Sequence, residues 1–94
     1  MTMPLYTFVL AYRGGCYISQ VRASSPAVAQ RAWAKQLPGA NVIGLGVKGK
    51  EHLTRDLMAR ENEPVPVPDM HKTWCSMSAL RNGLALIHIV ETTD

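Results

Sequence analysis

Residues 73–92, TWCSMSALRNGLALIHIVET, contain the clearest fold signal in the chain. Two apolar runs flank Arg81-Asn82-Gly83, and an Asn-Gly pair between apolar runs is the strongest short-range indicator of a β-hairpin. We therefore predict a hairpin over residues 72–92. Its second strand is apolar on both faces, which predicts a position in the middle of a sheet and not at an edge.

His88 is the only ionisable residue in the apolar part of this last strand. Because side chains alternate along a strand, His88 lies on the face opposite Ala85, Ile87 and Ile89, which we expect to meet helices. An imidazole on the open face can stay hydrated or form one hydrogen bond. Catalysis would need an orienting carboxylate or a second titrating group nearby, and the sequence identifies neither. We therefore interpret His88 as a structural residue of an open sheet face.

The N-terminal region predicts a second hairpin, over residues 5–23. Its two runs of β-branched and aromatic residues flank Gly14-Gly15, which suits a two-residue turn. This pairing places Phe8 opposite Val21 and Leu10 opposite Ser19. The predicted core face carries Phe8, Leu10, Tyr12, Tyr17 and Val21, and the opposite face carries Thr7, Val9, Arg13, Ile18, Gln20 and Arg22.

A helix over residues 26–37 follows the first hairpin. Ser25 can cap its first turn, and Pro26 is suited to the first helical position because its missing amide hydrogen would be unpaired there anyway. A period of 3.6 residues places Ala29, Ala32, Trp33 and Leu37 on one side. We expect Trp33 to anchor this helix on the sheet face that carries Phe8, Leu10, Ile87 and Ile89.

The middle of the chain predicts a short strand and a helix within residues 41–61. The strand is expected at 41–47 and the helix at 50–61, with Leu53, Leu57 and Met58 buried. Residues 63–69 contain three prolines and predict a stiff, extended linker to the last hairpin. The order of elements predicts one α+β domain over residues 1–94: a mostly antiparallel sheet of two hairpins, with one or two helices on one face.

The composition is typical of a globular chain, with 47% hydrophobic and 18% charged residues. No apolar stretch approaches the roughly 18 residues needed to span a bilayer. The first residues lack the basic start and the cleavage site of a signal peptide. We therefore expect a cytoplasmic protein. Cys16 and Cys75 are expected to be reduced thiols, with Cys75 acting as a small core residue.

No catalytic, metal or cofactor site is predicted. His52, His71 and His88 are dispersed, and Cys16 has no identifiable base to activate it. The stretch GLGVKGK at 44–50 misses the spacing of a phosphate-binding loop, because Lys50 is followed by Glu51. We interpret this stretch as a flexible basic loop.

Charge distribution suggests two classes of partner. Residues 1–47 contain no Asp or Glu. Our first hypothesis is a non-enzymatic protein-binding module, more narrowly a bacterial immunity or antitoxin protein that neutralises a toxin domain. The alternative is an RNA-binding module that uses the basic N-terminal half. The oligomeric state is left open. The candidate partner-binding residues are Ile18, Gln20, Arg22 and His88 on the open face, and Glu61 and Glu63 on an acidic rim.

Two partial resemblances involve about a third of the chain. The opening hairpin and the alanine-rich helix after it resemble the start of HicB-type antitoxins. The α+β order is similar to that of double-stranded-RNA-binding domains. The Pro-Gly-Cys strand ending of the former and the basic helix start of the latter are missing here, so neither resemblance establishes membership.

Overall fold

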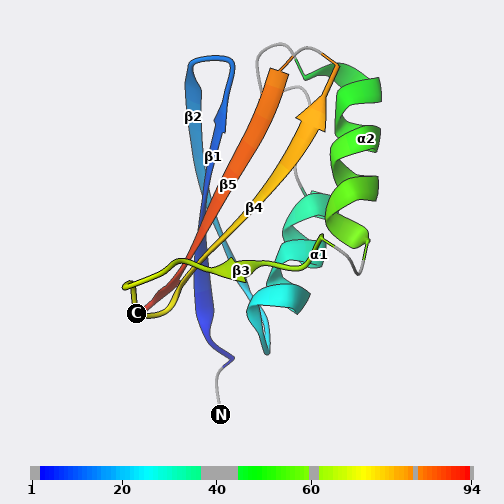
Figure 1. Cartoon of the computed structure of the whole chain (residues 1–94). Coiled ribbons are helices and arrows are strands. Elements are labelled where there is room, and N and C mark those ends of the chain that lie inside the picture. Colours follow the sequence, from blue (N-terminus) through cyan, green and yellow to red (C-terminus); the bar gives the residue numbers. More distant parts are fainter. Residues whose placement is uncertain (1–2, 37–44, 60–61, 82, 94) are drawn as a thin grey trace.

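The chain forms one antiparallel sheet with two helices packed on the same face (Figure 1). The computed structural model describes residues 3–36, 45–59, 62–81 and 83–93. The strand order across the sheet is β2-β1-β5-β4-β3. The predicted α+β class is therefore confirmed. In chain order the elements are β1 (Leu5–Tyr12), β2 (Gly15–Arg22), α1 (Pro26–Gln36), α2 (Gly46–Met58), β3 (Val65–Pro66), β4 (Thr73–Leu80) and β5 (Gly83–Thr92).

The C-terminal hairpin forms as the sequence predicts. Leu80 pairs with Gly83 next to the turn, and β5 pairs with β4 on one side and β1 on the other. The strand that is apolar on both faces is thus the central one. Ala85, Ile87 and Ile89 are buried beneath the helices, whereas His88 is half-buried on the other face.

The register of the N-terminal hairpin differs from the prediction by two residues. The turn is Arg13-Gly14 instead of Gly14-Gly15, and Phe8 lies opposite Ser19 instead of Val21. Both turn residues have positive φ, 49° and 80°, as a type I′ turn requires. Gly15 instead belongs to β2, where a Cβ atom would lie 2.6 Å from the Tyr17 hydroxyl oxygen, so the small residue makes room for that ring. Because the shift is even, each strand side chain keeps its predicted face.

Trp33 anchors α1 on the sheet, as predicted. Its indole is 2% exposed and stacks on Phe8, with ring centroids 5.0 Å apart. Its Nε1–H donates a hydrogen bond to the Ser19 hydroxyl at 2.8 Å. Phe8, Leu10, Ile87 and Ile89 around it are fully buried, so this face of the sheet is the centre of the core.

The helix α1 begins as predicted, but its buried stripe is rotated toward α2. The Ser25 hydroxyl accepts a hydrogen bond from the Val28 amide at 3.2 Å, which confirms the cap. Ala29 is buried as expected, whereas Ala32 is only half-buried and Gln30 and Ala34 are buried instead. The cause is α2, whose Thr54 hydroxyl donates a hydrogen bond to the Ala34 carbonyl at 3.3 Å. Leu37 lies outside the described residues.

The helix α2 replaces part of the expected strand at 41–47. Gly46 and Val47 are its first two residues, so the helix begins four residues before the expected start at residue 50. Residues 41–44 lie outside the described part of the chain. Leu53 and Leu57 are buried, as predicted. Met58 is 36% exposed, contrary to the prediction, because it lies in the last turn and about 100° around the helix from Leu57.

The proline linker at 63–69 also contributes an edge strand. Val65 pairs with Cys75 and Pro66 with Trp74, so β3 adds two residues to the outer side of β4. Proline has no amide hydrogen to donate, which explains why this strand is short and lies at an edge. The linker therefore connects α2 to β4 and also forms the sheet edge beside β4.

Candidate functional site

The sheet surface without helices is the main candidate site. Cross-strand partners define three rows on it, running from the middle of the sheet toward the hairpin turns. We call these ten residues the open face: Ile18, Val9, His88 and Cys75 in the first row, Cys16, Ala11, Leu86 and Met77 in the second, and Leu84 and Ala79 in the third.

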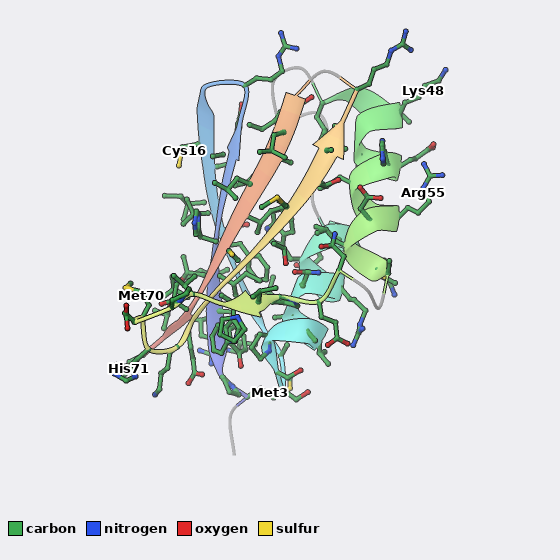
Figure 2. The ribbon with its side chains drawn as sticks, in the orientation of Figure 1. Met3, Cys16, Lys48, Arg55, Met70 and His71 are labelled. Carbon is green, nitrogen blue, oxygen red and sulfur yellow. The ribbon has the colours of Figure 1, made fainter. Side chains whose placement is uncertain are left out.

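Most of the open face is apolar and accessible to solvent. Ile18 is 68% exposed, Met77 53% and Leu84 52%. Figure 2 shows Cys16 pointing away from the helices on this side of the sheet. Single exposed apolar residues are common, but adjacent ones on neighbouring strands form a continuous patch of the kind found at contact sites.

The end of this surface away from the hairpin turns is polar. The Gln20 amide donates a hydrogen bond to the Thr7 hydroxyl at 3.0 Å, and the hydroxyls of Thr7 and Thr92 lie 2.6 Å apart. An Arg22 Nη1–H donates to the Met3 carbonyl at 3.0 Å. We call Thr7, Gln20, Arg22 and Thr92 the polar end. Leu5 and Val90 lie in the same rows, so this end mixes hydrogen-bonded and apolar side chains, whereas the open face is mostly apolar.

The four predicted sheet residues do lie on one face. Ile18 and His88 share a row, both beside Val9, while Gln20 and Arg22 belong to the polar end. Glu63 is exposed just before β3, at the sheet edge opposite β2. A partner that covers only a small part of the sheet could therefore not touch both Glu63 and Arg22. Glu61, the other predicted rim residue, lies outside the described residues.

Sequence reasoning missed the contribution of β4 to this surface. Cys75 is half-buried on the open face and is not the core residue that we expected. It alternates with Trp74 and Ser76, which face the helices. Met77 follows the same alternation, and this signal alone would have placed both residues on the open face.

The helix-covered side contains a buried polar network instead of a ligand site. Gln30 is 1% exposed, and its amide donates hydrogen bonds to the carbonyls of Leu57 at 3.1 Å and Asn62 at 2.9 Å. The Ser76 hydroxyl donates to the Gln30 carbonyl oxygen. Every buried side-chain nitrogen or oxygen in the described ranges has a partner. These groups join α1, α2 and β4 and leave no unpaired donor for a ligand.

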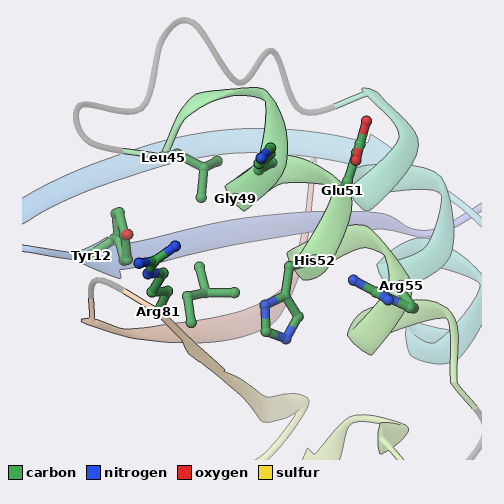
Figure 3. Close-up of a pocket in the computed structure, with 9 residues that line it drawn as sticks. Tyr12, Leu45, Gly49, Glu51, His52, Arg55 and Arg81 are labelled. Atoms are coloured by element: carbon green, nitrogen blue, oxygen red, sulfur yellow. The ribbon is translucent and has the colours of Figure 1, made fainter.

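A second candidate is a pocket between α2 and the ends of β1 and β4 (Figure 3). Its volume is about 470 Å³. Its cationic side chains would attract a small anion, but Lys48, Arg55 and Arg81 are all exposed, so water weakens their effect. The lining residues are Tyr12, Leu45, Lys48, Gly49, Glu51, His52, Arg55, Leu80 and Arg81.

Part of this pocket comes from the stretch that we expected to be a flexible basic loop. In GLGVKGK, residues 46–50 form the first turns of α2, so the prediction of a loop is wrong there. The helix has no side-chain cap at Leu45. Lys48 and Gly49 line the pocket because they lie on the side of α2 that faces the ends of β1 and β4.

His52 has an acidic partner that sequence reasoning did not identify. Its Nε2 atom lies 3.5 Å from Asp56 Oδ2, one helical turn away. The Ser78 hydroxyl donates a hydrogen bond to the same carboxylate oxygen. A nucleophilic serine needs the imidazole as its acceptor, and here the carboxylate takes that place. The arrangement holds α2 against β4 and does not activate Ser78.

A sheet that binds RNA needs exposed aromatic rings on which bases can stack, and two tyrosines of the N-terminal half lie in the core instead. Tyr6 and Tyr12 are 2% and 3% exposed on the helix-covered side. Burial, with a smaller contribution from the charge of Glu91, raises the pKa of Tyr6. The ring of Tyr6 meets Trp74 edge to face, with centroids 6.0 Å apart. Neither ring is available to a nucleic acid.

The described residues were also compared with the requirements of a metal site and of a membrane-spanning helix. No three His, Cys, Asp or Glu side chains in them are grouped so that they could hold a metal ion. None of their helices is both long and apolar enough to cross a bilayer.

No protein-family model matches this chain, and no significant match was found among curated proteins or solved structures. The functional interpretation therefore depends on the open face, the polar end and the pocket.

Proposed function

We propose that this protein is a protein-binding module and that the open face is its contact surface. One observation carries the proposal: three adjacent rows of mostly apolar side chains lie on a sheet face without helices. Burial of apolar area is the main favourable term in most protein association. Ile18, Met77 and Leu84 supply the most exposed part of that area.

The position of these residues on strands also favours binding. A hydrogen-bonded sheet holds its side chains in place before the partner arrives, so little ordering is needed at the contact. The polar end lies next to the open face, where Gln20 and Arg22 can form the polar rim that protein interfaces commonly have. His88 adds one polar group within the apolar rows.

An immunity or antitoxin protein remains the narrower hypothesis within this class. An inhibitor of a toxin domain needs only a rigid, complementary surface, and the open face offers one. A toxin gene directly beside the gene for this chain would favour the hypothesis, and an isolated gene among metabolic genes would oppose it. RNA binding stays the second candidate, because the buried rings of Tyr6 and Tyr12, which the sequence already assigned to the core face, cannot stack on bases.

A capture experiment with two matched variants tests the proposal. Met77→Glu places a charge on the open face, and Val47→Glu makes the same type of change on α2, where Val47 is 77% exposed. Both sites are accessible to solvent, so neither variant should unfold. We expect a protein retained by the immobilised wild type to be lost with Met77→Glu and kept with Val47→Glu, because burying an unpaired carboxylate is costly.

Equal retention of that protein by all three forms would contradict the proposal. Circular dichroism and thermal melting of each variant establish that the chain is folded. The sequence-based alternative, a contact at the acidic rim, predicts instead that Glu63→Lys abolishes retention while Met77→Glu does not.

A further inference from the structure

We infer that a second copy of this chain covers the open face, so that two sheets pack against each other with their helices outward. The inference rests on the proposed function, because it names the partner of the same surface. Figure 1 shows that both helices lie on one side of the sheet, so no described helix covers the open face. Size, charge and shape each support a second copy as the occupant.

The sheet face is just large enough for a weak, specific dimer. The strands β1, β2 and β4 contain eight residues each, and β5 contains ten. At about 3.3 Å per residue and about 4.8 Å between strands, these four strands present about 500 Å² of flat area. If the polar end is included, two copies would bury about 1,000 Å², which is at the lower limit for a specific interface and fits a weak dimer.

The charge distribution allows the surface to meet itself. In a two-fold dimer the same patch lies on both sides, so several charges of one sign on it would be brought close to one another. Arg22 is the only Lys, Arg, Asp or Glu on this side of β1, β2, β4 and β5. It belongs to the polar end, outside the apolar rows. The net charge of +3 is therefore carried almost entirely by other surfaces.

The shape of the sheet is also compatible with itself. All strands twist with the same hand, and two sheets of equal twist pack face to face with their strands about 30° apart. The open face has small side chains, Ala11, Cys16, Cys75 and Ala79, between larger ones such as Leu86 and Met77. Side chains of unequal size on facing sheets can interdigitate, which gives the close packing that a stable contact needs.

Sedimentation velocity between about 1 and 300 μM protein tests the inference, since weak specific dimers dissociate in the micromolar range. The wild type should move from the 10.3 kDa monomer to twice that mass as its concentration rises. Met77→Glu should stay monomeric, and Val47→Glu should behave as the wild type does. His88→Leu should dimerise several-fold more tightly, because it replaces a polar group by an apolar one.

A wild type that is monomeric at every concentration would overturn the inference, and so would a Met77→Glu variant that still dimerises. The latter result would indicate pairing through the free edge of β2. The capture experiment separates this failure from that of the proposed function. Suppose that the wild type is monomeric but that the protein it captures is lost with Met77→Glu. The open face is then still a binding surface, and a second copy is excluded as its occupant.

Discussion

Trp33 is the largest of the buried side chains of α1. Its indole stacks on Phe8, is almost fully buried, and has its nitrogen satisfied by Ser19. Removal of a buried indole costs both the transfer of apolar area and the cavity that remains. A small domain has only about 5–15 kcal/mol of stability to lose.

We predict that Trp33→Ala lowers the free energy of unfolding by roughly 3–5 kcal/mol. Urea denaturation followed by circular dichroism measures the change. Val28→Ala on the same helix is the matched control and should change the free energy little, because Val28 is 41% exposed. An unchanged urea midpoint in Trp33→Ala would show that this indole does not anchor the helix.

At the scale of elements, strong local signals were enough to predict two parts of the structure. The Asn82-Gly83 pair predicted the C-terminal hairpin, and Ser25-Pro26 predicted the start of α1. Each of these signals acts through backbone geometry over a few residues, so distant parts of the chain cannot easily override it. These elements were predicted with nearly their observed bounds.

The start of α1 provides a test of one such signal. The Ser25 hydroxyl accepts the Val28 amide hydrogen bond, so Ser25→Ala removes the cap and should lower the free energy of unfolding by about 1 kcal/mol. Ser24→Ala is the control, because Ser24 is exposed and precedes the cap. Thermal melting compares the two. Equal melting temperatures would mean that the cap does not stabilise α1.

Other features depended on contacts that the sequence does not show. The sequence contained two places for a two-residue turn near Gly14, and the packing of Tyr17 beside Gly15 selects between them. The start of α2 at Gly46 was missed because no capping residue precedes it. Gln30 was not expected in the core, since its hydrogen-bond partners lie on α2, β4 and the segment after α2.

The candidate site was predicted in part. Alternation along the strands correctly placed Ile18 and His88 on the same face, because an even shift in register preserves that face. The pairing of β1 with β5 is what makes the surface continuous, and this contact joins segments about eighty residues apart. No local pattern indicates such a pairing. Cys75 and Met77 are different, because they lie in the predicted hairpin and alternation along β4 already indicated that they are neighbours of His88 and Leu86.

For the whole molecule, the distribution of apolar side chains over the two sheet surfaces is the central feature. One surface is covered by α1 and α2. The other presents the three rows of the open face, which are accessible to solvent in a single copy. Hydration of this area is unfavourable, and the contact that we propose with a second copy would remove it. The fold and the proposed contact therefore follow from the same excess of apolar residues on the central strands.

The reactivity of Cys75 tests most directly whether the open face is covered in solution. This thiol lies beside His88 in the first row of the proposed contact and is partly accessible in a single copy. Alkylation by iodoacetamide, read at the Cys75 peptide by mass spectrometry, gives its rate at each protein concentration. We predict a rate that falls several-fold as the wild type dimerises and that stays constant for Met77→Glu. A wild-type rate that does not change with concentration would contradict the account.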